Sequence, residues 1–212
     1  MLGQQAETIV ILRPAASWLL SLLLLAGNAA SAADWTALPG SSLGFSASFQ
    51  GERFEGRFVK FNPQIRFDPA RLGASRFDVG IDLGSADTRN QERDDMLRSA
   101  EFFSARQQPQ ARFVAGKFRA LGGNRFVADG VLTLKGISKP VSLRFTWAAG
   151  AKPVLTGEAS LRRLDFAVGT GDWTDTELLP NEVKVSTRLL LAPAAGKAAP
   201  PAAKRASTGA KN

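Results

Sequence analysis

The sequence predicts an all-β protein: an antiparallel eight-stranded barrel with one short helix, at about residues 89–99, closing one end. Three observations support this fold class. From residue 41 to residue 192, most segments alternate apolar and polar residues, the pattern of strands with one buried face. Turn residues separate these segments. Only residues 79–103 change from this alternation to helical spacing.

About eight antiparallel strands with one apolar face each must close on themselves or stack as two sheets. Glycines on the apolar face favour closure, because they permit the strong coiling of a small barrel and leave space inside it. These glycines are Gly56, Gly130 and Gly157. If the barrel is hollow, Gly130→Phe should block its interior without unfolding it. The mixture of large and small inward residues fits a packed core or a cavity, and both interpretations stay open.

The N-terminal part of the predicted barrel begins with a hairpin. Alternation over residues 43–49 and 54–58 flanks its turn. The next segment ends where Asp68 and Pro69 turn the chain, and a strand over 76–83 follows. One face of that strand carries Phe77, Val79, Ile81 and Leu83.

The single helix follows this strand. Thr88 and Gln91 have the spacing of a capping box, and acidic residues come next, at the positive end of the helix dipole. Met96, Ala100 and Phe103 fall on one side. The charged residues suit a structural crossover that plugs a barrel end. A second interpretation makes the helix the floor or lid of a ligand cavity.

The remaining strands follow Pro109, which marks the return to extended chain. Gly122, Gly123 and Asn124 form a hairpin turn between the first two of them. The alternation of apolar residues is most regular over 141–147. The predicted strands are residues 111–119, 125–135, 141–147, 155–161 and 183–189.

The two ends of the chain differ in composition from the barrel. Arg13 precedes an apolar run at 18–26 and small residues that end at Ala32, which predicts a secretory signal peptide over residues 1–32. The run is shorter than the ~20 residues of a membrane span, although an uncleaved anchor is the alternative. Residues 193–212 contain no large apolar side chain and predict a disordered basic tail rich in Ala and Pro.

Composition excludes several function classes. The net charge of +8 resembles that of nucleic-acid-binding proteins, but four of the basic residues lie in the tail, and we expect no nucleic-acid partner. The chain has no Cys, His or Tyr, which excludes a Cys or His nucleophile, a Ser-His-Asp triad and an ordinary zinc site. We therefore expect no catalytic and no metal residues. The alternative of an enzyme depends on the carboxylates of Asp82, Asp87, Asp94 and Asp95.

Four segments carry a family resemblance: Ile81–Thr88, Arg93–Ser99, Glu101–Phe103 and Gly130–Val141. They resemble the YceI-like family in the same order along the chain, over about residues 39–191. The resemblance implies a lipocalin-like barrel in a periplasmic, secreted protein. It also implies that the barrel binds a polyisoprenoid lipid, such as a ubiquinone-like quinone tail or a polyprenyl phosphate, and requires no other cofactor.

Two further features refine the resemblance. Residues 169–175 and 181–185 are similar to the version of this domain found beside cytochrome b561-type membrane proteins. This similarity implies an alternative function, docking on a membrane redox protein or on the membrane surface. Many relatives have a His in the first hairpin, where this chain reads Phe49 to Phe54 without one. The oligomeric state is left open, with a homodimer among the possibilities.

The expected site is the apolar interior of the barrel, where ordinary core packing is the competing role for each residue. Arginine and lysine side chains near the helix are candidates for binding a head group, although Arg93 or Arg98 pairing with a nearby carboxylate (Asp94, Asp95 or Glu101) is the competing interpretation. Trp173 is either at the cavity mouth or a plug that holds its loop to the barrel. The expected cavity residues are Phe45, Phe49, Phe54, Phe58, Phe77, Val79, Ile81, Met96, Leu97, Phe102, Phe103, Phe126, Leu132, Leu143, Phe145, Trp147 and Trp173, and the head-group candidates are Arg93, Arg98 and Lys135.

Overall fold

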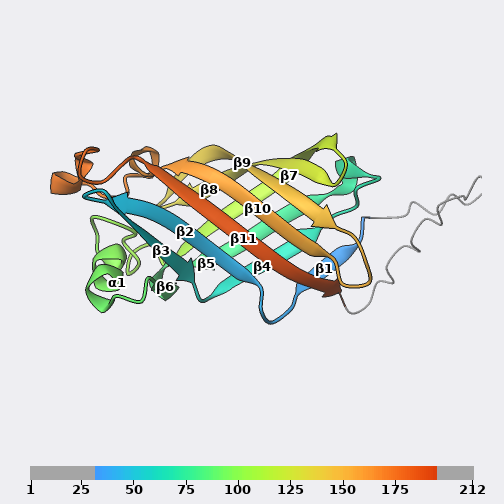
Figure 1. The fold of residues 1–212 in the computed structure, drawn as a ribbon, viewed down its shortest axis with the longest axis horizontal. Helices are drawn as coiled ribbons and strands as arrows, with labels where there is room; N and C mark the ends of the chain where they lie inside the picture. Colours follow the sequence, from blue (N-terminus) through green and yellow to red (C-terminus); the bar gives the residue numbers. More distant parts are fainter. Residues whose placement is uncertain (1–31, 195–212) are drawn as a thin grey trace, which may run out of the picture.

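A computed structural model describes residues 32–194 and consists of one antiparallel sheet that closes into a barrel (Figure 1). The predicted signal peptide, apart from its last residue, and all but the first two residues of the predicted tail lie outside this range. The strand segments are β1 (Asp34–Ala37), β2 (Ser42–Phe49), β3 (Glu52–Phe58), β4 (Phe61–Arg66), β5 (Arg76–Asp82), β6 (Ala86–Asp87), β7 (Gln110–Gly122), β8 (Arg125–Leu134), β9 (Ile137–Ala148), β10 (Val154–Arg162) and β11 (Glu182–Pro193).

These segments make eight barrel strands. The sheet runs from β4 through β5, β7, β8, β9 and β10 to β11, and β1 pairs with both β11 and β4, which closes the circle. β2 continues β1 along β11, β3 pairs with β2 and is continued by β4, and β6 continues β5 beside β3. The predicted fold class is confirmed. β1 was not predicted from the sequence, and β11 extends to Pro193, the first residue of the predicted tail.

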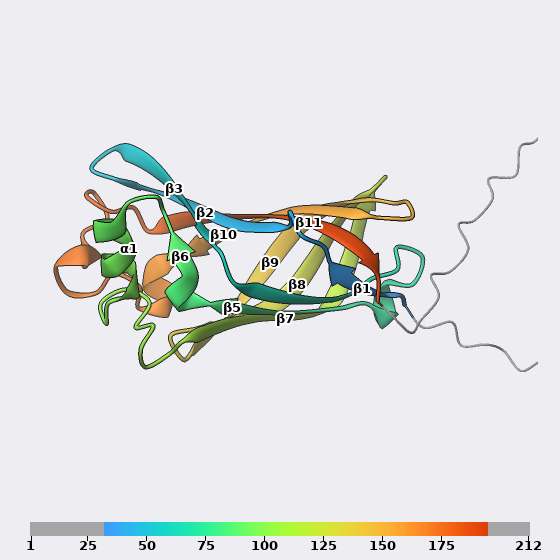
Figure 2. The same ribbon diagram turned by 90° about the horizontal axis from the view of Figure 1, so that it is seen from below.

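Helices and loops gather at one end of the barrel. The helical segments are α1 (Gln91–Arg98), η1 (Leu72–Ala74), η2 (Leu83–Ser85), η3 (Arg163–Phe166) and η4 (Gly171–Thr174). We call α1 together with residues 99–109 and 163–181 the cap. The cap lies at one end of the barrel, and β1 and the last residues of β11 lie toward the other (Figure 2). No helix within residues 32–194 is both long and apolar enough to cross a membrane.

The start of α1 differs from the predicted capping box. The N-cap is Asn90, whose side-chain oxygen accepts a hydrogen bond of 3.0 Å from the Arg93 N–H. Thr88 lies before the helix, where its N–H and hydroxyl both donate to the buried carboxylate of Asp94, at 2.8 and 2.7 Å. The box was wrong because Asp94, six residues along the chain, binds Thr88 and leaves the capping position to Asn90.

Two clusters fill the barrel. The cluster near the cap contains Phe45, Leu97, Phe102 and Phe103. At the other end, Phe67 lies at the centre of a group of rings whose centroids are 4.9 to 6.1 Å from its own. We call this group the aromatic plug. Its members are Phe67, Phe77, Phe118, Phe126, Phe145 and Trp147.

The inward glycines do not leave open space, contrary to the expectation from sequence. A Cβ on Gly56 would lie 2.3 Å from the ring of Phe45, which stacks over the glycine. A Cβ on Gly130 would lie 2.5 Å from the Val114 carbonyl oxygen, so Gly130→Phe would clash with backbone and disrupt the sheet instead of blocking a cavity. At Gly157, Leu143 and Phe145 occupy the corresponding place. The glycines permit neighbouring rings and chains to approach closely.

An ion pair on the outer face gives a pH-dependent prediction. The Asp129 carboxylate accepts hydrogen bonds from the Arg119 guanidinium, at 2.8 Å, and from the Ser142 hydroxyl, at 2.6 Å. Arg119 first and Ser142 second lower the pKa of Asp129 from 3.8 to about 2. Because the folded pKa is depressed, this carboxylate stabilises the fold above pH 3.8 and loses that contribution as the pH falls toward 2.

Asp129→Asn should therefore reduce the free energy of unfolding at neutral pH by ~0.5–1 kcal/mol, the range of a solvent-screened surface pair. The difference from the unmodified protein should shrink as the pH falls below 4 and vanish near 2. Urea unfolding across this pH range measures it. Asp165→Asn is the matched control, since its exposed carboxylate approaches Arg162 only to 3.9 Å. A difference that stays constant with pH would contradict the role of the Asp129 charge.

Candidate ligand-binding cavity

The barrel contains a cavity of about 190 Å³ between the cap and the aromatic plug. Its lining is apolar except for Thr187 and Arg163. The remaining lining residues are Leu43, Phe45, Ala47, Phe54, Phe58, Phe61, Pro63, Ile65, Phe77, Val79, Ile81, Leu83, Leu97, Phe102, Phe103, Ala111, Phe113, Leu132, Leu134, Val141, Leu143, Leu155, Ala159, Leu161, Phe166, Val168, Leu179, Val183, Val185 and Leu189.

The alternation of the strands positions these side chains. In β5, Phe77, Val79 and Ile81 face inward at every second residue, as predicted, and each lines the cavity. The cap closes the space at one end, where Phe103 packs against Phe58 of β3 with ring centroids 5.8 Å apart. A backbone hydrogen bond of 2.8 Å from Gln50 to the Leu178 carbonyl ties the tip of the β2–β3 hairpin to the cap.

The structure brings most of the expected cavity residues together around one space. Those on the lining are Phe45, Phe54, Phe58, Phe77, Val79, Ile81, Leu97, Phe102, Phe103, Leu132 and Leu143. Three others belong to the opposite end, where Phe126, Phe145 and Trp147 form part of the aromatic plug and do not line the cavity. Phe49 and Met96 pack behind the lining near the cap. That the lining residues bind a ligand stays a prediction.

Trp173 holds the cap loop in place. Its ring packs against Phe49 and Phe102, with centroids 5.9 and 5.4 Å away, and its Nε1–H donates to the Glu101 carboxylate at 2.9 Å. It does not line the cavity. Of its two expected roles, Trp173 therefore has the second: it holds its loop in place and joins residues 163–181 to the rest of the cap.

The three expected head-group residues bind the protein itself and do not line the cavity. The Arg93 guanidinium donates to Thr88 and lies 4.6 Å above the ring of Phe54. Lys135 donates to backbone carbonyl oxygens of the cap, at 2.7 Å for Ala167, and its partial burial lowers the pKa of its ammonium group. These contacts fasten the cap.

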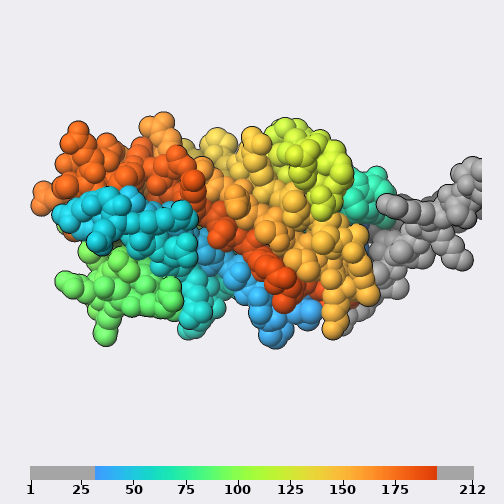
Figure 3. All heavy atoms as spheres, viewed as in Figure 1, coloured from blue at the N-terminus to red at the C-terminus, as the bar shows by residue number. Residues whose placement is uncertain are grey.

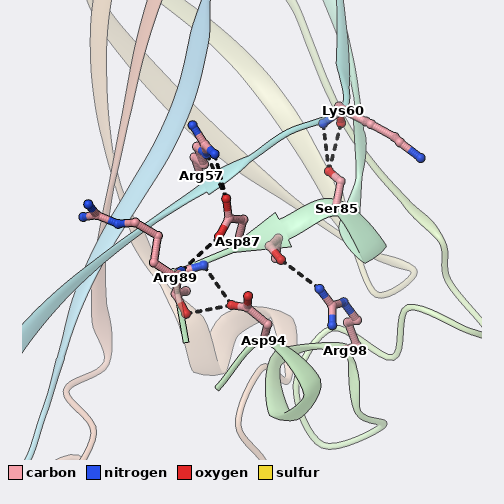
Figure 4. Close-up of polar contacts among 9 residues, drawn as sticks. Arg57, Lys60, Ser85, Asp87, Arg89, Asp94 and Arg98 are labelled. Carbon is pink, nitrogen blue, oxygen red and sulfur yellow. Dashed lines mark hydrogen bonds and ion pairs between the residues drawn. The ribbon is translucent and has the colours of Figure 1, made fainter. Parts of the chain in front are cut away.

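Arg98 also fastens the cap to the barrel. It donates to the carbonyl oxygens of Gly84 and Ala86, and it pairs with Asp95 at 2.8 Å, one of the pairings expected from sequence. Figure 4 shows Arg98 reaching from α1 toward β6. In the space-filling view, the atoms of α1 (green) lie beside those of the β2–β3 hairpin (cyan) at this end of the molecule (Figure 3).

The carboxylates considered for catalysis also stabilise local structure. Asp87 accepts hydrogen bonds from the Arg89 N–H and from the Arg57 guanidinium, which together lower the pKa of Asp87 (Figure 4). Asp82 accepts from the Gly84 N–H at the start of η2. Asp94 and Asp95 are occupied by Thr88 and Arg98, as described above. Within the part of the chain that the structure describes, no three metal-ligating side chains cluster.

Sequence reasoning missed both polar residues of the cavity, Thr187 and Arg163, of which Arg163 is charged. It lies at the start of η3 and is 4% exposed. The signal was present, because the inward positions Leu155, Gly157, Ala159 and Leu161 continue with a period of two to residue 163. Many apolar residues of the lining were also missed, among them Phe113, Phe166, Val168 and Leu179. The last three lie in the cap, where no regular period applies.

Comparison with known proteins adds a family to this geometry. The sequence profile of the YceI-like domain matches residues 35–191. The chain belongs to the YceI-like family. A UPF0312 protein of Vibrio vulnificus strain YJ016 is 31% identical over 179 residues, which cover 78% of this chain and 95% of that protein. The predicted domain, residues 39–191, begins four residues later than the profile match.

Two solved structures are similar to this fold. The crystal structure of Burkholderia cenocepacia BcnA has 32% sequence identity and a TM-score of 0.71, over 74% of this chain and 99% of BcnA. A domain from Saccharophagus degradans described as polyisoprenoid-binding has 17% identity and a TM-score of 0.59, over 77% of this chain and 99% of that domain. At that identity the likeness concerns the fold alone.

Proposed function

We propose that this protein is a periplasmic, non-catalytic carrier that holds a polyisoprenoid lipid in the barrel. The observation that carries the proposal is the cavity in the barrel, whose lining is apolar apart from two residues. Each methylene group buried there contributes ~0.8 kcal/mol, so a prenyl chain binds without needing many hydrogen bonds. The described ligand class of the Saccharophagus degradans domain agrees with this chemistry. The periplasmic location depends on the signal peptide predicted over residues 1–32.

The cavity volume limits how much of a lipid it accepts without adjustment. About 190 Å³ exceeds the ~150 Å³ of a dry engineered cavity that admits benzene, and it is below the ~300–1,000 Å³ of pockets for drug-sized ligands. The space suits a few isoprene units. A longer chain requires lining side chains such as Phe58 and Phe103 to rotate away from each other.

The proposal is tested by native mass spectrometry and organic extraction of the protein purified from its own host. We expect a co-purifying prenyl lipid, either a quinone or a polyprenyl phosphate, in a reproducible ratio to protein. Lipid class should not change between membrane-free preparations, since a carrier selects its ligand. Protein that arrives without lipid and does not take up added prenyl ligands would contradict the proposal.

A further inference from the structure

Arg163 is the one charged side chain among the residues that line the cavity. It is 4% exposed, and the apolar residues Phe166, Val168 and Leu179 line the same part of the space. The prenyl chain of the proposed ligand is a hydrocarbon and gives no reason for a buried cation in the barrel wall. Burying an ionised group is unfavourable unless partners compensate for the lost hydration, so the surroundings of Arg163 show what it is arranged to bind.

Every hydrogen-bond partner of Arg163 is a neutral backbone carbonyl. Nη1 donates to Val168 and Gly169, at 3.0 and 2.9 Å, Nη2 donates to Leu179 at 2.6 Å, and Nε donates to Pro180 at 3.1 Å. A guanidinium group has five N–H bonds. Four of them therefore donate to carbonyl oxygens of the cap, and one N–H of Nη2 has no acceptor among these carbonyls.

The charge of Arg163 has no carboxylate partner among residues 32–194. The nearest acidic residue in sequence, Asp165, approaches Arg162 instead, and Glu101 accepts from Trp173. Carbonyl oxygens supply only partial negative charge, and burial lowers the pKa of Arg163. A full or partial negative charge on a ligand in the cavity would provide the compensation that the protein does not supply.

The backbone around the guanidinium is built to approach it closely. Gly169 has a φ of +74°, and a Cβ at this position would lie 2.6 Å from Nη1 of Arg163. The glycine thus lets residues 166–169 fold over the side chain and hold it in one orientation. A fixed donor loses little conformational freedom when a ligand binds, which favours recognition.

We propose that Arg163 is a head-group anchor. The remaining N–H and the uncompensated charge bind an oxygen of the ligand's polar end, a carboxylate, phosphate or carbonyl, at the cap end of the cavity. The prenyl chain then runs toward the aromatic plug. This inference rests on the proposed carrier function and adds two things to it: the residue that binds the ligand's polar end, and the orientation of the ligand in the barrel.

The test compares four farnesyl compounds with the unmodified protein: farnesene, farnesol, farnesoic acid and farnesyl phosphate. Each is titrated against bound N-phenyl-1-naphthylamine, a neutral apolar fluorophore. We expect the acid or the phosphate to displace the fluorophore at a concentration lower than that of farnesene by roughly tenfold or more, the effect of a hydrogen bond to a charged group. Which of the two binds more tightly identifies the head group.

Equal displacement by all four compounds would overturn the Arg163 inference and leave the carrier function standing. No displacement by any of them would contradict the carrier function itself. In Arg163→Met, the affinity for the acid and the phosphate should fall to that for farnesene. Arg162→Met is the matched control, because that neighbouring side chain is 71% exposed, and it should keep the head-group preference. If Arg163→Met does not fold, Arg163→Lys, which keeps the charge but loses the planar fork of donors, should reduce the preference.

Discussion

An Ala159→Trp protein should fold but lose prenyl-ligand binding. Ala159 lies in β10 opposite Val185 of β11, and both residues line the cavity. The indole has no room except the cavity, because the residue faces inward. If it displaces about four methylene groups of ligand, at ~0.8 kcal/mol each, affinity falls by roughly 200-fold. Overpacking costs ~1–3 kcal/mol, less than the ~5–15 kcal/mol that stabilises a typical domain.

The measurement is fluorophore displacement by farnesol, together with circular dichroism and urea unfolding to establish that the barrel is intact. Ser160→Trp is the control, since the next residue of the same strand faces solvent and carries the same new side chain on the outer wall. It should bind as the unmodified protein does. A folded Ala159→Trp protein with undiminished affinity would mean that prenyl ligands bind elsewhere.

The barrel was predictable because the face of a strand on which a side chain lies depends only on the local sequence. The inward positions of Phe77, Val79 and Ile81 follow from a period of two that needs no knowledge of the partner strands. β1 was missed because four residues with one clear apolar anchor, Trp35, carry too short a pattern. Its place is fixed instead by pairing with β4 and β11, strands that are distant in the sequence.

The division of the interior into cavity and plug could not be predicted. Phe145 and Leu143 alternate identically in β9, yet Leu143 lines the cavity and Phe145 belongs to the plug. The difference depends on Phe67, which comes from the end of another strand and fills the space between the rings. Volume is a property of several strands at once, whereas the direction of a side chain belongs to one.

Sequence reasoning predicted open space at the inward glycines, where there is none, and did not predict the buried arginine of the cavity. Gly56 suggested open space, but the ring of Phe45 from the neighbouring strand covers it, as aromatic residues often do beside strand glycines. Arg163 was not predicted as a cavity residue, although the alternation of β10, continued by one more residue, places it inward. Charge at an inward position is a stronger indication of a site than the charged residues of α1, whose contacts fasten the cap.

Phe67→Ala should produce the largest loss of stability. The side chain is 1% exposed, its ring lies within 6.1 Å of the five other rings of the aromatic plug, and its carbonyl accepts a hydrogen bond of 3.0 Å from the Trp35 indole. Phe→Ala substitutions in such cores cost ~3–5 kcal/mol, because the surrounding rings cannot collapse into the space. That is about a fifth or more of the free energy of unfolding of a typical domain, ~5–15 kcal/mol.

Urea unfolding should show a lower midpoint with an unchanged slope, since the same surface is exposed on unfolding. Phe54→Ala is the control: that side chain is half-buried on the cavity wall, so it should lose less stability but weaken farnesyl binding. Phe67 does not line the cavity, and Phe67→Ala should retain farnesyl binding at temperatures where it is folded. The two substitutions should therefore have opposite effects on stability and on farnesyl binding. That difference would separate the aromatic plug, which holds the barrel together, from the cavity, which we propose holds the lipid. If Phe67→Ala lost binding while Phe54→Ala kept it, the two ends of the barrel would have the opposite roles.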